Sequence, residues 1–258
     1  IDDGHYLFTP EQKADFVAAE PGSAPFFRRW LGSEEFLNGI ERWCLLLKDV
    51  SPKELDQLPH CLERVAAVRK YREKSGSAPT IALAETPRRF HVEFFPKGNY
   101  LEVPEVSSEK RRYIPIGFLD SSILASNLLK TVPDATLYHF GILESNVHMA
   151  WMRAVCGRLK SDYRYSKDVV YNSFPWPSPT AGQKEKIEQS AQAILDARAL
   201  YPDSSLADLY DPTLMPKELL QAHRQNDRAV MAAYGFSTKM TESDCVAELF
   251  KRYAEMVE

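Results

Sequence analysis

The sequence lacks the cysteine pattern of a disulfide framework or a zinc site. Its four cysteines, Cys44, Cys61, Cys156 and Cys245, lie far apart and form no C-x-x-C pair. Structural zinc sites and small secreted domains both need cysteines at close, recurring spacings. We therefore expect no metal site and no disulfides, and the cysteine usage fits a reducing cytoplasm.

Long apolar runs are missing as well. The longest is WCLLL at residues 43–47, whereas a membrane-spanning helix needs about eighteen apolar residues in a row. The chain starts with IDDGHYLF, which is acidic where a signal peptide is basic. We expect a cytoplasmic protein with no membrane partner, and we interpret the start as a cut within a longer chain.

The sequence has none of the short motifs that identify common catalytic or cofactor sites. It contains no G-x-G-x-x-G or Walker loop and no G-x-S-x-G turn. Its six histidines show no H-E-x-x-H spacing, and its carboxylates form no acid–base pair that spacing alone reveals. We therefore expect no catalytic residue, no metal and no cofactor in this chain.

The composition is that of an ordinary globular protein with a basic middle. The 258 residues are 44% hydrophobic and 26% charged, and a chain of this length usually forms two domains. Residues 88–178 carry 12 Lys and Arg against 9 Asp and Glu, a net charge of +3, while residues 1–87 carry a net −3 and residues 179–258 a net −4. A basic segment between acidic ones hints at a surface that faces a polyanion.

Local patterns predict helices in the first third of the chain. Apolar residues three and four positions apart predict a helix over residues 34–47. Pro52 opens a second helix, which runs to residue 74 with a break at Pro59. Its basic end, RKYREK, favours a solvated helix terminus over a nucleic-acid contact.

Residues 79–143 consist of short apolar runs separated by Pro, Gly, Asn and Ser. The runs TIALAE, RFHVEFF, NYLEVP, RRYIPIGFL and TLYHFGIL are typical of strands. A helix returns at ESNVHMAWMRAVC, with Gly157 as its expected C-terminal cap and GRLKSDYRYS, residues 157–166, as the loop that follows. DVVYNSF is then expected to be a strand and PWPSP, residues 175–179, a linker.

The chain after this linker predicts helices. Thr180 begins the first with a capping box, Pro216 opens the second and Thr241 starts the third. We therefore expect an α+β fold, with a domain of helices and short strands over residues 1–178 and a helical domain over residues 179–258.

Two clusters of basic side chains lie in the central segment. SSEKRRYIPIGF presents Lys110, Arg111 and Arg112 just before an apolar run. Such a triplet is as typical of a solvated turn as of a contact to DNA phosphates.

The second cluster, GRLKSDYRYS, combines cations, a carboxylate and two tyrosines. Lys160 can donate to O6 and N7 of a guanine, and Asp162 can accept from the amino group of the paired cytosine. If the loop is extended, the two side chains point to the same side and could read both halves of one G·C pair. A salt bridge within a surface loop explains the same residues, and the residues alone leave both explanations open.

Longer segments resemble a known family. FLNGIERWCLLL, SSEKRRYIPIGF, YHFGILESNVHMAWMRAVCGRLKSDYRYS with VVYNSFPWP, and LYDPTLMPKELLQAHRQNDRAVMAAYGF are similar, in this order, to the C-terminal portion of MmeI-like restriction-modification enzymes and related DNA adenine methyltransferases. The resemblance implies a target recognition domain over residues 1–178 and a helical C-terminal domain over residues 179–258 that completes a clamp on double-stranded DNA.

The resemblance also implies what is missing. The parent enzyme would carry an upstream methyltransferase domain that uses S-adenosylmethionine, and often a nuclease domain. The family's Asn-Pro-Pro-aromatic catalytic motif has no counterpart here, and NSFPWP echoes it only superficially. We therefore expect this chain to be inactive alone and to recognise DNA for the parent enzyme.

Individual residues receive roles from the same resemblance. Lys160 and Asp162 match a specificity position at which Lys-x-Asp and Glu-x-Arg pairs go with opposite orientations of one G·C pair, and Arg164 matches another base-reading position. The residues expected to contact or position the DNA backbone are Lys110, Arg111, Arg112, Arg153, Arg158, Tyr163 and Tyr165. The alternative is a protein-interaction module, in which the acidic helical domain docks a partner and no DNA is bound.

Overall fold

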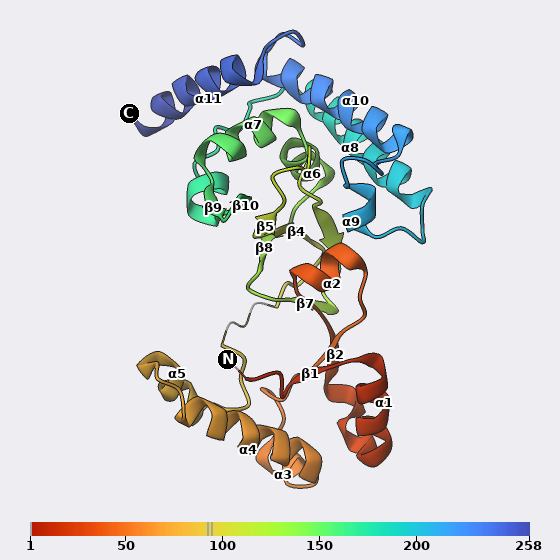
Figure 1. Ribbon diagram of the computed structural model, residues 1–258, viewed down its shortest axis with the longest axis vertical. Helices are drawn as coiled ribbons and strands as arrows, with labels where there is room; N and C mark the ends of the chain where they lie inside the picture. The colour runs from red at the N-terminus through yellow and green to blue at the C-terminus, as the bar shows by residue number, and fades with distance from the viewer. Residues whose placement is uncertain (1, 92, 94) are drawn as a thin grey trace. The chain divides into compact units, whose positions relative to one another are not determined.

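The fold consists of two compact units. The computed structural model describes residues 2–91, 93 and 95–258 (Figure 1). Unit 1 comprises Ile1–Glu35, Ile40–Lys97 and Ser121–Asn127, and unit 2 comprises Phe36–Gly39, Gly98–Asp120 and Leu128–Glu258. Each unit therefore takes up segments that are separated in the sequence, and each is described by itself.

A four-stranded sheet forms the centre of unit 1. Its strands, in the order β1-β3-β2-β7, are Leu7–Phe8, Trp43–Leu45, Phe27–Leu31 and Ile123–Ala125. The pairs are antiparallel except for β2 and β7, which are parallel. Phe8, Phe27 and Leu45 are buried in its core.

The helices of unit 1 begin where prolines and capping side chains allow. They are α1 (Pro10–Ala19), η1 (Pro21–Phe26), α3 (Pro52–Leu55), α4 (Pro59–Glu73), α5 (Ala78–Ala82) and η2 (Leu83–Glu85). The predicted break at Pro59 is confirmed. The buried carboxylate of Glu20 accepts hydrogen bonds from the His60 and Cys61 amides, at 2.8 and 3.1 Å, and so caps the first turn of α4.

Two predictions in the first third were wrong. Residues 34–47 form the short helix α2 (Ser33–Asn38) and then strand β3. Gly39, at φ +67°, ends α2, and the Ile40 amide donates back to the Glu35 carbonyl at 3.1 Å, which is a common glycine stop. TIALAE lies in helices α5 and η2 and not in a strand, because Pro79 sits in the first turn of a helix. The predicted strand RFHVEFF includes residues 92 and 94, which lie outside the described residues.

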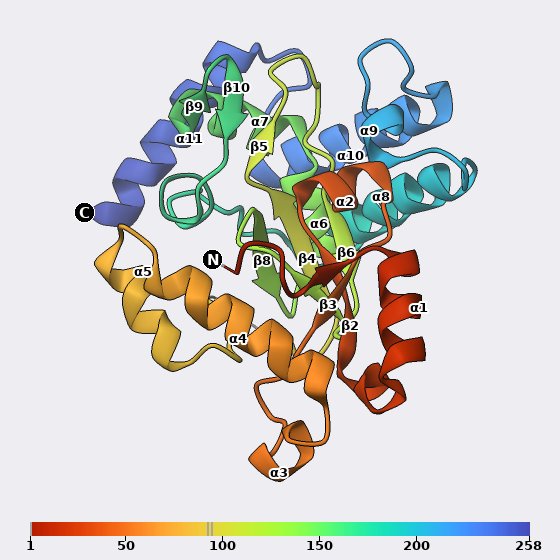
Figure 2. The same ribbon diagram turned by 60° about the horizontal axis from the view of Figure 1, so that its bottom comes forward.

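Unit 2 contains two three-stranded antiparallel sheets. The first, in the order β6-β4-β8, consists of Gly117–Leu119, Tyr100–Pro104 and Leu129–Pro133. The second, in the order β5-β10-β9, consists of Val106–Ser107, Asp162–Arg164 and Gly157–Leu159. Only Glu105 separates β4 from β5, so one residue joins the two sheets (Figure 2).

Three further segments of unit 2 differ from the sequence-based expectation. TLYHFGIL forms helix α6 (Leu137–Leu143), because the hydroxyl of Thr136 and the ring of His139 make a capping box. Helix α7 (Asn146–Val155) is confirmed, but Gly157 begins strand β9 and does not cap the helix. DVVYNSF contributes to the π-helix η3 (Lys167–Tyr171) and not to a strand.

The helices predicted after the linker are confirmed. They are α8 (Ala181–Ala199), α10 (Lys217–Tyr234) and α11 (Glu242–Val257), with the additional short helix α9 (Leu206–Leu209). Thr180 and Thr241 make the side-chain caps of α8 and α11, and Gly235 ends α10 at φ +73°. With helices and small sheets in both parts of the chain, the fold is α+β.

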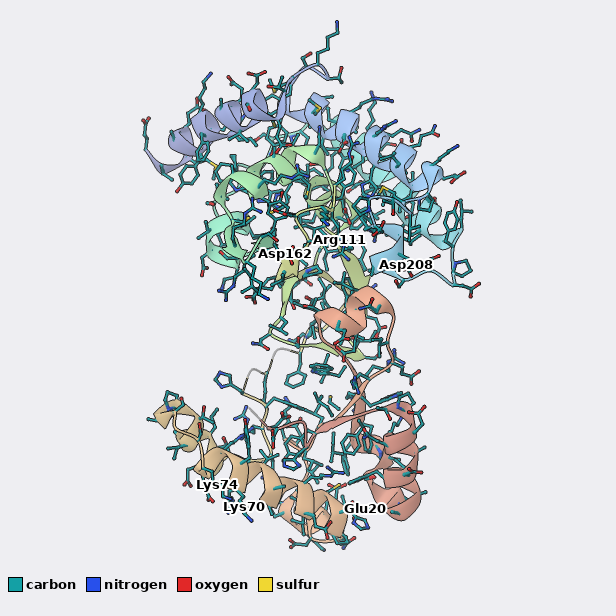
Figure 3. All side chains as sticks on the ribbon, viewed as in Figure 1. Glu20, Lys70, Lys74, Arg111, Asp162 and Asp208 are labelled. Carbon is teal, nitrogen blue, oxygen red and sulfur yellow. The ribbon has the colours of Figure 1, made fainter. Side chains whose placement is uncertain are left out.

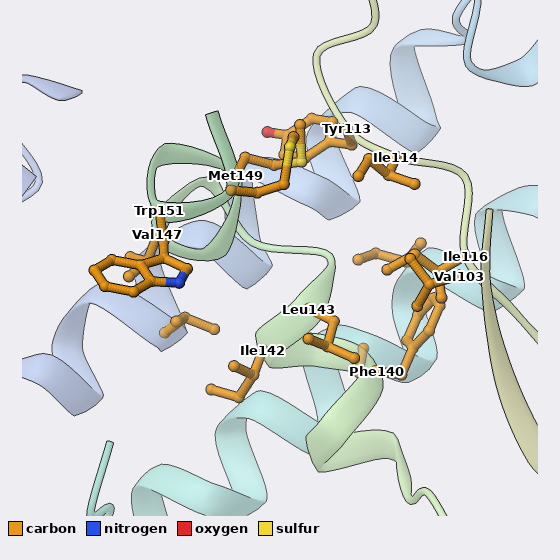
Figure 4. Packing of buried hydrophobic residues seen from close by; sticks show 14 of the residues in the cluster. Val103, Tyr113, Ile114, Ile116, Phe140, Ile142, Leu143, Val147, Met149 and Trp151 are labelled. Atoms are coloured by element: carbon orange, nitrogen blue, oxygen red, sulfur yellow. The ribbon is translucent and has the colours of Figure 1, made fainter. Parts of the chain in front are cut away.

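One hydrophobic core runs through unit 2. It extends from Leu101 on β4 to Leu249 on α11 and includes the fully buried Trp151 of α7 (Figure 4). The indole of Trp151 donates to the Val170 carbonyl at 3.1 Å, so that its single polar group is satisfied within the core. Among the helices that the structure describes, none is long and apolar enough to cross a membrane.

Candidate nucleic-acid interface

GRLKSDYRYS folds as a β-hairpin and not as the expected loop. Leu159 pairs with Asp162, so the turn consists of only Lys160 and Ser161. Lys160 adopts φ +56°, a conformation that tight hairpin turns require and that side chains other than glycine, asparagine or aspartate rarely take. The backbone therefore holds the exposed Lys160 at the tip of a short β-ribbon.

Side chains alternate along β10 and the residue after it. Tyr163 and Tyr165 are buried, whereas Arg164 is exposed and Asp162 is partly exposed. The Tyr165 hydroxyl hydrogen-bonds Nε2 of His148 at 3.0 Å, and burial holds the pKa of Tyr165 well above its ordinary value. Tyr165 thus fixes the hairpin to α7 and does not face the solvent.

Arg158 stiffens the hairpin from its other strand. Its guanidinium lies 4.2 Å from the centre of the Tyr163 ring and donates to the Ser161 carbonyl at 2.9 Å. It also faces Glu109, with a separation of 3.8 Å between the charged groups. These contacts connect the two strands and the turn.

The basic segment at residues 108–112 lies against this hairpin. Oδ1 of Asp162 accepts a hydrogen bond from the Glu109 amide at 3.3 Å. Burial lowers the pKa of Arg111, although the carboxylates of Asp211 and Asp162 act to raise it (Figure 3). The fold thus brings together two basic segments that are about fifty residues apart in the sequence.

The remaining predicted cations are placed differently from one another. Lys110 and Arg112 are exposed, and the guanidinium of Arg112 lies 5.6 Å from the centre of the Tyr113 ring. Arg153 donates to the Arg112 carbonyl at 2.9 Å and to the Glu242 carboxylate at 3.0 Å. Arg153 therefore ties this segment to α11, and its side chain is only 23% exposed.

Arg164 has a carboxylate partner that the sequence did not reveal. Oε1 of Glu105 accepts a hydrogen bond from Nε of Arg164 at 2.8 Å, and Oε2 accepts one from Lys130 at 2.7 Å. Glu105 and Lys130 come from other strands, so no local spacing in the sequence pointed to them.

Comparisons with known proteins agree with this geometry. Residues 1–178 match the family model of the MmeI target recognition domain, and residues 180–258 match that of the MmeI C-terminal domain. The chain belongs to the MmeI family. The MmeI resemblance seen in the sequence is thereby confirmed over nearly all of its length.

Two MmeI-like proteins are similar over the whole chain. DNA methyltransferase A of Bacillus subtilis (strain 168) is 39% identical over 257 residues, which are 100% of this chain and 29% of that protein. The structure of the type IIL restriction-modification enzyme MmeI in complex with DNA matches with a TM-score of 0.96 and 46% identity, over 99% of this chain and 34% of that one. The chain thus spans about a third of the length of these relatives.

Membership of the MmeI family implies S-adenosylmethionine, but the described residues do not fit this cofactor. Open sheets bind nucleotide cofactors beside a row of parallel strand ends. Within residues 2–91, 93 and 95–258 the sheets are short and, apart from the β2–β7 pair, antiparallel. We therefore assign no step of a reaction to this cofactor within the chain.

Proposed function

We propose that this chain recognises a specific sequence in double-stranded DNA, as part of a longer adenine DNA methyltransferase of the restriction-modification type. The observation that carries the proposal is the likeness to MmeI, solved in complex with DNA, at 46% identity and a TM-score of 0.96. An upstream domain of the same parent chain would bind S-adenosylmethionine and methylate an adenine flipped out of the duplex. The role of this chain is to place that adenine.

The β9–β10 hairpin supplies the base readout in this proposal. The major groove is about 12 Å wide and admits a two-stranded β-ribbon. Lys160, at the tip, donates to O6 and N7 of a guanine, and Asp162 accepts from the amino group of the paired cytosine. Because the Glu109 amide already holds Oδ1 of Asp162, that carboxylate enters the groove in a fixed orientation.

The other predicted residues divide into contacts and supports. Lys110, Arg112 and Arg158 are exposed, so they are available to phosphates, and the half-buried Arg111 lies beside them. Three further residues support this surface, since each is held by contacts within the protein: Arg153, Tyr163 and Tyr165. We further propose that residues 1–178 carry the recognition and that residues 179–258 complete the grip on the duplex.

An exchange of the two base-reading residues tests the proposal. The parent enzyme with Lys160→Glu and Asp162→Arg should prefer the opposite orientation of one G·C pair, because donor and acceptor have changed places. The measurement is the methylation rate on a panel of duplexes in which each base pair of the site is changed singly. An unchanged preference would contradict the readout.

Lys160→Gly is the matched control for the turn. Glycine takes a positive φ without strain, so the hairpin should form at least as well as before. We expect this variant to lose discrimination at the same base pair while its melting temperature stays the same or rises. Lost discrimination with a lowered melting temperature would point to damage to the fold.

The competing interpretation, a protein-interaction module, makes a different prediction for DNA. A chain that neutralises phosphates should lose affinity for labelled duplex steeply between about 50 and about 200 mM salt. The chain of 258 residues should show this loss. Absence of salt-sensitive binding would favour a role for the acidic helices in docking a protein.

A further inference from the structure

The backbone of Glu105 is fixed on both sides. Its amide donates to the Leu128 carbonyl at 2.9 Å, and its carbonyl accepts from the Tyr165 amide at 2.7 Å. Glu105 also lies at the single-residue junction between the two sheets of unit 2 (Figure 2). Its side chain therefore leaves the backbone from a rigid position, which suits a group that must orient another.

The carboxylate of Glu105 bridges one cation from each sheet. Oε1 accepts from Nε of Arg164 on β10 at 2.8 Å, and Oε2 accepts from Nζ of Lys130 on β8 at 2.7 Å. Partial burial acts to raise the pKa of Glu105, but the hydrogen bonds and charges of Lys130 and Arg164 outweigh it and hold the pKa below its ordinary value. The bridge is therefore ionised at neutral pH.

The bridge restrains Arg164 without covering it. The Glu105 side chain is 14% exposed, whereas that of Arg164 is 59% exposed. A guanidinium has five N–H donors in a planar fork. The bond to Glu105 uses Nε, which leaves the edge formed by Nη1 and Nη2 for a second partner in the same plane. That edge matches O6 and N7 of a guanine, the commonest specific contact of arginine with DNA.

Lys130 solves an electrostatic problem of this arrangement. A carboxylate near DNA repels the phosphates, and a lone Glu105 would cancel the charge of Arg164. With Lys130 on its other oxygen, the group of three keeps a net charge of +1. The orienting carboxylate thus costs the surface none of its attraction for DNA.

We propose that Glu105 is a positioning residue that presents Arg164 to a guanine, in a base pair other than the one read by Lys160 and Asp162. The inference rests on the proposed DNA recognition and adds a specificity-determining residue to it. Glu105 itself contacts no base. It acts by limiting the guanidinium to one plane, so that less conformational freedom is lost when two hydrogen bonds to guanine form.

The test compares Glu105→Gln, Arg164→Ala and the double variant in the full-length parent enzyme. Methylation rates are measured on the panel of singly substituted duplexes. Glu105→Gln keeps the shape of the side chain and removes its charge. We expect it to reduce discrimination about tenfold at the same base pair that Arg164→Ala affects. The double variant should discriminate no worse than Arg164→Ala alone, since both changes remove the same contact.

Two further readouts separate positioning from a merely structural role. Discrimination at the base pair of Lys160 and Asp162 should stay unchanged in Glu105→Gln, and so should the melting temperature within a few degrees. Lys130→Gln should weaken binding to all duplexes alike, because it changes charge and not the plane of Arg164. A uniform loss of discrimination in Glu105→Gln would overturn the inference, as would additive effects in the double variant.

The inference and the proposed function can fail separately. If the exchange at Lys160 and Asp162 moves the preference but neither Arg164→Ala nor Glu105→Gln alters discrimination, only the inference is wrong. If none of these variants changes any base preference, sequence recognition by this surface is wrong, and the inference is wrong with it.

Discussion

At the scale of single residues, the hairpin separates the side chains that hold the fold from those that face outward. Tyr163 and Tyr165 point into the core, and Lys160 and Arg164 point away from it. The sequence suggested either a base reader or a surface salt bridge for this stretch. In the structure Arg158 faces Glu109, and Asp162 accepts a backbone amide.

The buried histidine below the hairpin predicts a pH effect on stability. Burial lowers the pKa of His148 to about 3, whereas an unfolded histidine titrates near 6.5. Below about pH 6.5 the unfolded chain takes up a proton that folded His148 does not, so the free energy of unfolding falls as the pH falls. The slope from this residue is at most about 1.4 kcal/mol per pH unit.

The effect of His148 is measured as a difference between proteins. Burial raises the pKa of Glu102 to about 8, so that this carboxyl stabilises the fold on acidification and opposes the histidine. Urea unfolding of the wild type and of His148→Gln between about pH 7 and pH 5 isolates the contribution. We expect the stability of the wild type to fall relative to that of the variant as the pH is lowered; parallel curves would show that His148 does not titrate on unfolding.

At the scale of elements, the sequence predicted those helices whose ends are encoded locally. The caps at Thr180 and Thr241 and the stop at Gly235 each depend on residues within one turn, and these helices were found where expected. TLYHFGIL was wrong because a short apolar run fits a strand or a buried helix equally, and packing against α8 decides for the helix. Strand β3 was missed because its partners, β1 and β2, come from elsewhere in the chain.

The same distinction applies to the candidate interface. Lys160, Asp162 and Arg164 could be named from one contiguous stretch. Their neighbours Glu105, Glu109 and Lys130 could not, because strand pairing brings them there from positions about thirty to sixty residues away. Chemistry within a segment is readable from the sequence, whereas chemistry between segments needs the register of the sheets.

The contact of α6 with α8 predicts a sharp response to one methyl group. A Cβ on Gly141 would lie 2.7 Å from Cγ2 of Ile187 and 3.1 Å from both Cβ of Ala191 and Oδ1 of Asn226. These neighbours are buried and branched or hydrogen-bonded, so they cannot move aside freely. We expect Gly141→Ala to lower the free energy of unfolding by about 1–3 kcal/mol in urea, despite the better helix propensity of alanine.

Gly182 provides the control for this substitution. It lies in the first turn of α8, and a Cβ there would meet no atom within 4 Å. Gly182→Ala should therefore leave stability unchanged or raise it by up to about 1 kcal/mol. If both alanine variants behave alike, the close packing at Gly141 is not what limits the helix contact.

At the scale of the whole molecule, unit 2 does not end where the family's two models meet. Its single core contains Leu101 and Phe140 from the target recognition part together with Ile187, Ile194 and Leu249 from the C-terminal part. Burial of each such side chain contributes about 1.5–3 kcal/mol. The two parts therefore depend on each other for stability, although their separate roles in DNA recognition stay a prediction.

Truncation tests this dependence. A fragment of residues 1–178 should bind a hydrophobic dye and lose the cooperative unfolding of its second half, because it leaves the apolar faces of α6 and α7 uncovered. The chain of residues 1–258 should unfold cooperatively in that region. A fragment that keeps a sharp transition and binds no dye would show that the recognition part folds without the C-terminal helices.

The alternation along β10 also has a consequence for heredity. Under the proposed function, the codons for the outward residues Lys160, Asp162 and Arg164 lie within one very short stretch of the gene, interleaved with those for the inward tyrosines. A few point mutations, or the exchange of a fragment of a few codons between related genes, would then alter the DNA site while the core stays intact. Since the same domain directs every activity of its parent, such a change would give a lineage a new mark on its own genome in one step.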